Sequence, residues 1–426
     1  MLSGFCNRCR SHAMLVLGLM SALLSMSANA DELSFAKAQE LALQEAPVLL
    51  ANQEQIDASR QAAIPAGELP DPQLAIGVDN LPIQGADSFS FSRDFMTMQR
   101  IGLSQAFINP AKLDARVDAA TGRIALAEAQ TRVLRLQVQL ETAVAWINLE
   151  SIQRQLELVK ELDYENRLFQ QAVQARYAGG AGMAAEVLTP RQEAALIAER
   201  RDQLESNRTQ TRAQLKRWIG EAAAWAISGT TPDWPINLEA LSHGLHRHPE
   251  LDLFEPKTQV VNAEVAEAAA EKIPDWALQL AYQHRGPAYS DMVSLQVSVD
   301  LPVFPDSRQQ PLLAAKLHER TALQAEHQAA LQEHTAMLES ALAEHQRLLN
   351  AEKRSKELLL PLAEEKVNLS LAAWRGNRGD LPTLLAARRE RIDAKLKTIS
   401  LETERKQLAA RLHYTYSEDT LKNAGH

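Results

Sequence analysis

Three histidines, at positions 243, 246 and 248, form the densest group of metal-binding side chains in this sequence. A zinc site needs three or four convergent ligands. An internal repeat, described below, places His243 opposite Leu41 and His246 opposite Gln44 on ordinary helix, and no carboxylate-rich shell surrounds the group. We therefore predict that His243, His246 and His248 are helix-surface histidines, and that the chain binds no resident metal or cofactor.

The arrangements of residues that catalysis requires do not occur in this sequence. It contains no phosphate-binding loop, no Gly-x-Ser-x-Gly elbow and no His-Glu-x-x-His motif. Many Glu and Arg residues are spaced four apart, which is typical of the solvated face of a coiled coil. We therefore predict that the protein is not an enzyme.

The first 30 residues read as a secretory signal. Arg8 and Arg10 precede a short apolar run over 14–24, and Ala28-Asn29-Ala30 fits a small-x-small cleavage site. Both cysteines lie in this segment, so the mature chain is expected to have no disulfide, thiolate ligand or lipidated cysteine. Without the two signal arginines the net charge changes from −9 to −11, and an acidic exported protein is not expected to bind nucleic acid. No later apolar run is long enough for a membrane helix.

Two pairs of segments alternate apolar and polar residues, as membrane-spanning β-strands do. The clearer pair covers 276–301; the other has a strand near 73–80 and a second that starts near Ile101, with an external loop over 84–94. A polar face fits a water-filled lumen, and an apolar face fits lipid. The residues that we predict to face a lumen are Asp79, Ser294, Gln296, Ser298 and Asp300.

Four such strands cannot close a membrane barrel, which needs about eight. An open sheet edge in hydrocarbon leaves backbone groups unpaired at a cost of several kcal/mol each. If these strands cross a membrane, other chains must therefore complete the barrel. The alternative is an ordinary antiparallel sheet with one solvated face.

Long helical segments link the strand pairs to two glycine-marked turns. Residues 111–177 contain no proline and one glycine, and at 1.5 Å per residue they predict a coiled-coil-like helix of about 100 Å. Residues 308–374 repeat the pattern, with a kink or break expected at Pro361. Return helices are expected over 185–219 and 381–414.

These parallels indicate an internal duplication. At an offset of 197 residues Tyr177 meets Trp374, and Gly179 meets Gly376. The predicted organisation is a signal peptide (1–30), a first repeat (31–220), a linker (221–237), a second repeat (238–416) and a tail (417–426). The predicted fold class is mainly α with a small β part: long coiled-coil hairpins and four strands per chain.

Short motifs along the whole mature chain resemble those of the TolC-like outer-membrane efflux proteins. They are Leu-Pro-Asp-Pro (69–72), Gly-Leu-Ser-Gln-Ala-Phe (102–107), Arg-Tyr-Ala-Gly-Gly (176–180), Asp-Leu-Pro-Val-Phe (300–304) and the proline-containing helix segments around Pro47 and Pro249. Within 69–106, Asp79-Asn80-Leu81-Pro82 and Arg93-Asp94-Phe95-Met96-Thr97-Met98 resemble the branch that serves heavy-metal RND efflux pumps.

The resemblance implies a homotrimer in the outer membrane of a Gram-negative bacterium, in contact with outer-membrane lipid. Each protomer would give four strands to a shared transmembrane barrel and its hairpins to a periplasmic tunnel. A periplasmic adaptor protein and an inner-membrane RND-type pump are the implied partners, and heavy-metal cations the implied cargo. Two alternatives stay open: the chain is itself a periplasmic adaptor, or it is a duct for drugs or type I secreted proteins.

The resemblance also assigns adaptor docking and the pore aperture to the two turns. The docking residues that it implies are Arg176, Gly179, Gly180, Gly182, Gly376 and Gly379. A ring of carboxylates from symmetry-related chains selects cations, and Glu186 and Asp380 are the candidates here. The alternative for Asp380 is an N-cap of the return helix, a common use of Asp.

Overall fold

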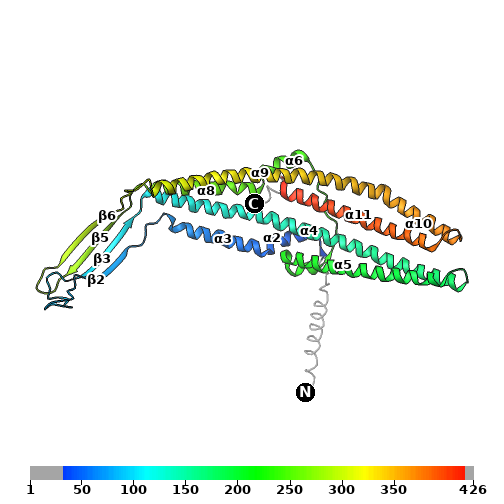
Figure 1. Cartoon of the computed structure of the whole chain (residues 1–426), viewed down its shortest axis with the longest axis horizontal. Helices are drawn as coiled ribbons and strands as arrows, with labels where there is room; N and C mark the ends of the chain where they lie inside the picture. Colours follow the sequence, from blue (N-terminus) through cyan, green and yellow to red (C-terminus); the bar gives the residue numbers. More distant parts are fainter. Residues whose placement is uncertain (1–31, 418–426) are drawn as a thin grey trace, which may run out of the picture. The chain divides into compact units, whose positions relative to one another are not determined.

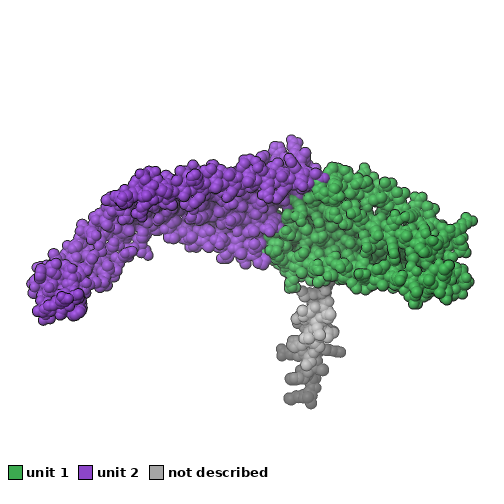
Figure 2. Space-filling model, in the orientation of Figure 1, with its two compact units in different colours: residues 1–46, 138–235, 344–411 green, residues 47–137, 236–343, 412–426 purple. Residues whose placement is uncertain are grey.

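The computed structural model describes residues 32–417. The predicted signal peptide lies outside the described residues, as does the predicted tail apart from Ser417. The chain forms two compact units (Figure 2). Unit 1 comprises Met1–Ala46, Val138–Pro235 and Glu344–Arg411, and unit 2 comprises Pro47–Gln137, Ile236–Ala343 and Leu412–His426. Each unit takes segments from both predicted repeats, so the division into repeats stays a prediction about the sequence.

The protein is mainly helical, with a small β part, as predicted. The principal helices are α2 (Phe35–Glu45), α3 (Pro47–Ala63), α4 (Pro110–Ala178), α5 (Thr189–Ile219), α6 (Leu238–Leu245), α7 (Pro249–Asp252), α8 (Phe254–Ala270), α9 (Gln309–Arg354), α10 (Leu360–Arg375) and α11 (Leu381–Tyr416). The helix expected over 111–177 is confirmed as α4. In the described part of the chain, no helix is both apolar enough and long enough to cross a membrane.

The predicted break at Pro361 is confirmed as a π-helical turn. Residues Ser355–Leu359 form the π turn η4 between α9 and α10. Proline has no N–H to donate to the carbonyl four residues earlier, so the regular hydrogen bonding of an α-helix is interrupted at this point. The buried hydroxyl groups of Ser355 and Thr398 lie 2.8 Å apart and tie the turn to α11.

Unit 1 is held together around an aromatic cluster near its short two-stranded sheet. In that sheet β1 (Glu32–Leu33) pairs in parallel with β4 (Ala226–Ile227). Trp146 of α4 is fully buried, and its indole Nε1 donates to the carbonyl of Leu33 at 3.1 Å. Phe35 packs edge-on against Trp146 and Trp234, with ring centroids 5.5 and 5.6 Å apart. Helix α4 pairs with α5, and α10 pairs with α11, as helical hairpins (Figure 1).

Unit 2 contains an antiparallel sheet of four strands in the order β2-β3-β5-β6 (Figure 1). Its strands are β2 (Gln73–Asp79), β3 (Met98–Phe107), β5 (Trp276–His284) and β6 (Met292–Val299). The predicted loop over 84–94 lies between β2 and β3 and contains no strand or helix. Pairing of β3 with β5 joins the two predicted strand pairs into one sheet.

Helices α4 and α8 pack closely where unit 2 leads into this sheet. A Cβ on Gly122 would lie 2.9 Å from Cγ2 of Val260, so the one glycine in the middle of α4 permits the close approach. At the start of α4, the buried Lys112 ammonium forms ion pairs with Asp275 at 2.8 Å and with Glu271 at 3.1 Å. These bonds attach the first turn of α4 to the segment that precedes β5.

Candidate functional site

The strand register divides the sheet into a polar face and an apolar face. Directly paired residues of antiparallel strands point to the same side of the sheet. Because the strands alternate in step, their polar residues gather mainly on one face and their apolar residues mainly on the other. One face is mainly polar or small and carries Gln73, Ala75, Gly77, Asp79, Met98, Arg100, Gly102, Ser104, Ala106, Ala277, Gln279, Ala281, Gln283, Met292, Ser294, Gln296 and Ser298. The opposite face is mainly apolar and carries Leu74, Ile76, Val78, Gln99, Ile101, Leu103, Gln105, Phe107, Trp276, Leu278, Leu280, Tyr282, His284, Val293, Leu295, Val297 and Val299.

Four of the five residues predicted to line a lumen lie together on the polar face: Asp79, Ser294, Gln296 and Ser298. There the amide of Gln283 exchanges hydrogen bonds of 2.9 and 3.1 Å with the hydroxyl of Ser294. The fifth, Asp300, follows the last residue of β6, and its backbone N–H donates to the carbonyl of Asp275 at 2.9 Å. That these residues face a lumen stays a prediction.

Most of the apolar face is exposed in the single chain, although Phe107 and Leu278 are half-buried. Ile76 retains 76% of its accessible surface, and Leu295 retains 70%. Trp276 and Phe107 stack at one end of this face, with ring centroids 4.1 Å apart, and Tyr282 lies near the other end. Six residue steps separate Trp276 from Tyr282, a span of roughly 20 Å. A tall apolar band bordered by aromatic side chains is the pattern of a lipid-facing barrel wall.

The two tips of unit 1 share one backbone conformation. We define the first tip as residues 176–186 and the second tip as residues 373–383, which are related by the offset of 197. Gly180 has φ of 76°, and its counterpart Asn377 has φ of 53°, so each tip places one residue in the left-handed region. The N–H of Ala181 donates to the carbonyl of Arg176 at 3.0 Å, and the corresponding bond from Arg378 to Ala373 is 2.9 Å.

Arg176 joins the first tip to the second. Its guanidinium donates to the carbonyl of Ala181 at 3.2 Å, to the carbonyl of Trp374 at 3.0 Å and to Oδ1 of Asn377 at 2.6 Å. It also lies 4.8 Å from the centre of the Trp374 ring, which is a cation–π contact. Beneath it, buried side chains pack α4 against α10 and α11: Phe169, Val173, Trp374, Leu381, Leu384 and Leu385.

The predicted aperture carboxylates both serve as local caps. Asp380 Oδ1 accepts the N–H of Thr383 at 2.9 Å, so the N-cap alternative is confirmed for this residue. Hydrogen bonds from Thr383 lower the pKa of Asp380 below its ordinary value. Glu186 Oε2 accepts the N–H of Met183 at 3.2 Å and starts the 3-10 turn η2 (Ala184–Leu188). Asp380 is exposed and Glu186 is half-buried, and an aperture role for them stays a prediction.

The remaining glycines predicted for docking have structural roles of unequal strength. A Cβ on Gly182 would lie 3.2 Å from Oε2 of Glu186, and one on Gly379 would lie 3.0 Å from Cβ of Ala373. Both positions therefore favour a small residue. Gly179 and Gly376 carry ordinary φ angles and close the last turns of α4 and α10 through their N–H groups, each bonded at 3.0 Å.

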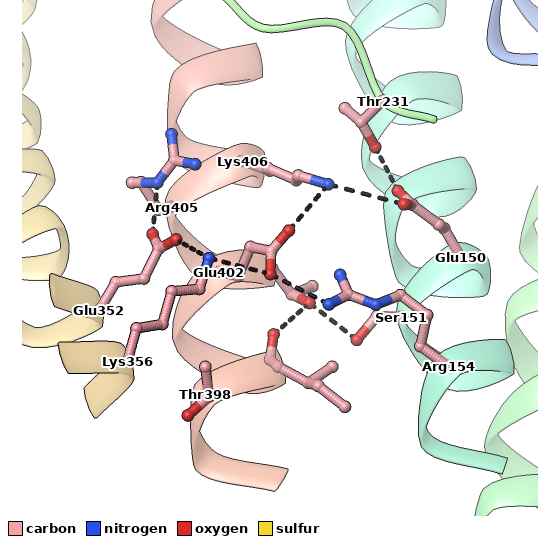
Figure 3. A network of polar contacts seen from close by, with 12 residues as sticks. Glu150, Ser151, Arg154, Thr231, Glu352, Lys356, Thr398, Glu402, Arg405 and Lys406 are labelled. Carbon is pink, nitrogen blue, oxygen red and sulfur yellow. Dashed lines mark hydrogen bonds and ion pairs between the residues drawn. The ribbon is translucent and has the colours of Figure 1, made fainter. Parts of the chain in front are cut away.

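A network of seven charged side chains links α4, the end of α9 with η4, and α11 in unit 1 (Figure 3). Its members are Glu150, Arg154, Glu352, Lys356, Glu402, Arg405 and Lys406. Glu402 lies at the centre, 3.1 Å from Arg154, 3.2 Å from Lys406 and 3.5 Å from Lys356. The hydroxyl of Thr231 donates to Glu150 and brings the linker into the same network.

The network contains three carboxylates and four cations, so every carboxylate has at least one cationic partner. Burial acts to raise the pKa of Glu402, but the hydrogen bond and charge of Arg154, with Lys406 and Lys356, outweigh burial and hold the pKa at about 2. Glu352 also has a lowered pKa, because its bonds to Lys356 and Arg405 outweigh burial. Carboxylates held ionised in this way brace helices and are poor proton donors or acceptors at neutral pH. The sequence offered no motif for this network.

The structure corrects the prediction for one of the three histidines. His243 and His246 are exposed on α6 and its end, as predicted. His248 is instead buried, because it caps α7 and stacks on His334 of α9 with ring centroids 4.2 Å apart. His334 lies 86 positions further along the chain, so its proximity carried no local sequence signal.

Known structures share this fold, although sequence comparison finds no relative. No protein-family model matches the chain, and no curated protein matches it. A membrane protein from Pseudomonas aeruginosa superposes with a TM-score of 0.76 at 19% identity, covering 90% of each chain. The outer-membrane protein VceC from Vibrio cholerae has a TM-score of 0.73 at 18% identity, covering 90% of this chain and 96% of that one.

A third match is the open state of the MtrE outer-membrane channel from Neisseria gonorrhoeae. It has a TM-score of 0.72 at 17% identity, and covers 91% of this chain and 90% of that one. The likeness extends over nearly the whole length of all three proteins and establishes the fold. The chain thus has the fold of outer-membrane channels, in which long helical hairpins accompany a small sheet that one chain cannot close into a barrel.

Proposed function

We propose that this protein is the outer-membrane exit channel of a tripartite efflux system. It conducts its cargo passively from a periplasmic adaptor and an inner-membrane RND-type pump to the exterior. Three copies assemble as a homotrimer in the outer membrane of a Gram-negative bacterium, and the helical hairpins extend into the periplasm. The energy for transport comes from the pump.

The division of the sheet into two faces carries this proposal. The exposed apolar face, bordered by Trp276, Phe107 and Tyr282, matches contact with outer-membrane lipid. The polar face matches the wall of a water-filled lumen. Strands β2 and β6 each have one unpaired edge in the single chain, and such edges are costly in lipid. Three copies together supply twelve strands, which is within the range of closed membrane barrels.

The two tips are the proposed docking and gating region. Adaptor binding that favours a splayed arrangement would shift the channel from closed to open, because a ligand moves an equilibrium toward the state that it binds more tightly. The Arg176 bonds to Trp374 and Asn377 stabilise the tips in their present arrangement. The carboxylates of Glu186 and Asp380, repeated around a three-fold axis, would give the aperture a negative ring that favours cations.

Heavy-metal cations are the proposed cargo. This part of the proposal rests on the resemblance of residues 69–106 to the branch of channels that serves heavy-metal pumps, and on the acidic character of the chain. A duct for drugs or for type I secreted proteins is the competing cargo class. Metal sensitivity of a deletion strain, with drug sensitivity measured in parallel, distinguishes these classes.

Planar-bilayer recording of the purified mature chain tests the channel itself. We expect stepwise conductance from a detergent-extracted trimer that resists mild heating in SDS. A matched variant with Leu295→Asp and Val297→Asp, on the apolar face, should not insert, whereas Ser294→Asp and Ser298→Asp should insert and change ion selectivity. Recovery of the protein only from the soluble periplasm, without an oligomer or conductance, would favour the adaptor alternative.

A further inference from the structure

Two histidines and a glutamate of unit 2 converge from two separate segments of the chain. His248 and Glu250 belong to the start of α7, and His334 belongs to α9. Nε2 of His334 lies 3.0 Å from Oε2 of Glu250, and one potential ligand atom from each of the three residues lies within 4.8 Å of the others. Within the described residues 32–417, this is the one such group of three metal-ligating side chains.

The surroundings keep these side chains ordered and one side open. His248 and His334 are buried, while about half of the Glu250 side chain is exposed, which leaves an entry path for an ion. The end of α11 closes the other side: the Tyr416 ring lies 5.7 Å from the His248 ring, and its hydroxyl donates to the carbonyl of His334 at 3.3 Å. A Cβ on Gly244 would collide with the Tyr416 carbonyl, so α6 lies directly against the same residue.

Hydrogen bonding within the group leaves its polar atoms incompletely satisfied. Nδ1 of His248 accepts the N–H of Glu250 at 3.2 Å, which is a long bond. Nδ1 of the buried His334 has no hydrogen-bond partner.

We propose that His248, Glu250 and His334 bind one divalent cation of the zinc class. Two imidazoles and one carboxylate suit Zn²⁺ and its neighbours among the transition metals and do not suit Mg²⁺ or Ca²⁺. Ligands about 2 Å from a tetrahedral ion lie about 3.3 Å from one another, a separation that the His334–Glu250 pair already has. His248 must move toward the ion and give up its bond to the Glu250 N–H, so this site binds more weakly than a four-ligand structural site.

The consequence of binding is a cross-link between α7 and α9, next to the end of α11. The ion replaces the hydrogen bond between His334 and Glu250 and draws His248 toward the same point. Because it binds the folded chain and not the separated segments, it raises the stability of unit 2. This inference concerns a resident ion and does not rest on the proposed cargo or on channel function.

Zinc titration of the full mature chain, purified in detergent without a histidine tag and stripped with a chelator, tests the site. We expect one Zn²⁺ per chain and a higher melting temperature with Zn²⁺, with no competition from Mg²⁺. His334→Ala should weaken binding by more than about 100-fold, and the nearly isosteric Glu250→Gln by about tenfold or more.

The exposed neighbours His243 and His246 supply the matched control. The double variant His243→Ala/His246→Ala should keep the wild-type affinity and stoichiometry. Equal binding by wild type and Glu250→Gln, or loss of binding in the control variant alone, would overturn the proposal. Because Glu250→Gln preserves the shape of an exposed side chain, its circular dichroism and trimer assembly should match those of the wild type, which separates loss of ligation from misfolding.

Discussion

The first and second tips share the backbone of the turn itself and differ in their side chains. In both, the last helical residues close through equivalent hydrogen bonds, and one residue, Gly180 or Asn377, is left-handed. The side chains that follow then diverge. The first tip carries Arg176 where the second carries Ala373, and the second carries Asp380 where the first carries Met183.

This difference assigns separate tasks to the two copies. Arg176 reaches across to Trp374 and Asn377, so the first tip supplies the connection and the second supplies its acceptors. Asp380 starts α11 directly after the turn, whereas the first copy needs a 3-10 turn before α5 begins with Pro190 in its first turn. The two turns thus share their hydrogen bonds, whereas the side chains around them make the pair asymmetric.

Deletion of the first tip is the most severe test of this division. Removing residues 176–182 should abolish export while the trimer still assembles, because the barrel strands and most of the hairpin packing lie elsewhere. Resistance of a complemented deletion strain and trimer content on a native gel are the measurements. The matched deletion of residues 373–379 removes the acceptors instead; intact export in either strain would contradict a docking role for that tip.

Glu402→Gln tests the second connection between the helices that carry the tips. The substitution leaves the partly buried Arg154 and Lys406 without their shared carboxylate, and we expect a loss of unfolding free energy on the order of 2–4 kcal/mol. Thermal unfolding followed by circular dichroism measures it. The control is Glu404→Gln, two residues further along on the exposed side of α11, which should change the unfolding free energy little.

The same carboxylate predicts an acid dependence. The pKa of Glu402 in the folded chain is about 2, below its ordinary value of 4.5, so the folded state binds fewer protons than the unfolded state. Its contribution to stability is therefore complete above about pH 4.5 and is lost as the pH falls toward 2. The Glu402→Gln variant should lose less stability than the wild type over this interval; equal losses would refute the assignment.

Arg176→Ala removes the connection between the tips without shortening either of them. Charged hydrogen bonds at an exposed position contribute modestly, so we expect a loss of about 1 kcal/mol together with a higher resting conductance. Arg176→Lys should restore only part of the effect, because an ammonium cannot form the same fork of bonds. Arg375→Ala, an exposed arginine of the second tip, is the control. Unchanged resting conductance in Arg176→Ala would show that the bonds of Arg176 to Trp374 and Asn377 do not control gating.

Substitutions at the left-handed residues test whether the two turns are equivalent. Gly180→Ala should cost about 1 kcal/mol, because a side chain disfavours positive φ, and Gly180→Asn should cost less. Asn377→Gly keeps the turn but removes the acceptor for Arg176. It should therefore resemble Arg176→Ala in conductance. The double variant Arg176→Ala/Asn377→Gly should have about the same conductance as either single variant.

Asp380→Asn separates the cap from the aperture charge and has the smallest expected effect. Asn caps helices about as well as Asp, so helix stability should hardly change. If Asp380 contributes to a negative ring, cation selectivity in bilayer recordings should fall, whereas a purely capping role predicts unchanged selectivity. Asp380→Ala removes both properties and provides the comparison, and Glu186→Gln tests the other carboxylate in the same way.

Local patterns in the sequence were sufficient for much of the fold. The helix expected over 111–177 is α4 (Pro110–Ala178), because a long stretch free of proline with coiled-coil spacing has one regular solution. The two-residue period of the strands predicted which residues share a face, and the register confirms it for Asp79, Ser294, Gln296 and Ser298. Asp300 directly follows the last residue of β6, and its position toward a lumen stays a prediction.

Tertiary structure decided the contacts between segments that are remote in sequence. Nothing near Arg176 indicates that its guanidinium reaches Asn377, and nothing near Glu402 indicates Arg154, because those partners are defined by how the hairpins pack. His248 shows the limit most clearly: the repeat alignment predicted a helix-surface histidine, but the fold buries it beside His334. Periodicity determines which elements form and which side of each is apolar, whereas the distances that make a site exist only after those elements pack.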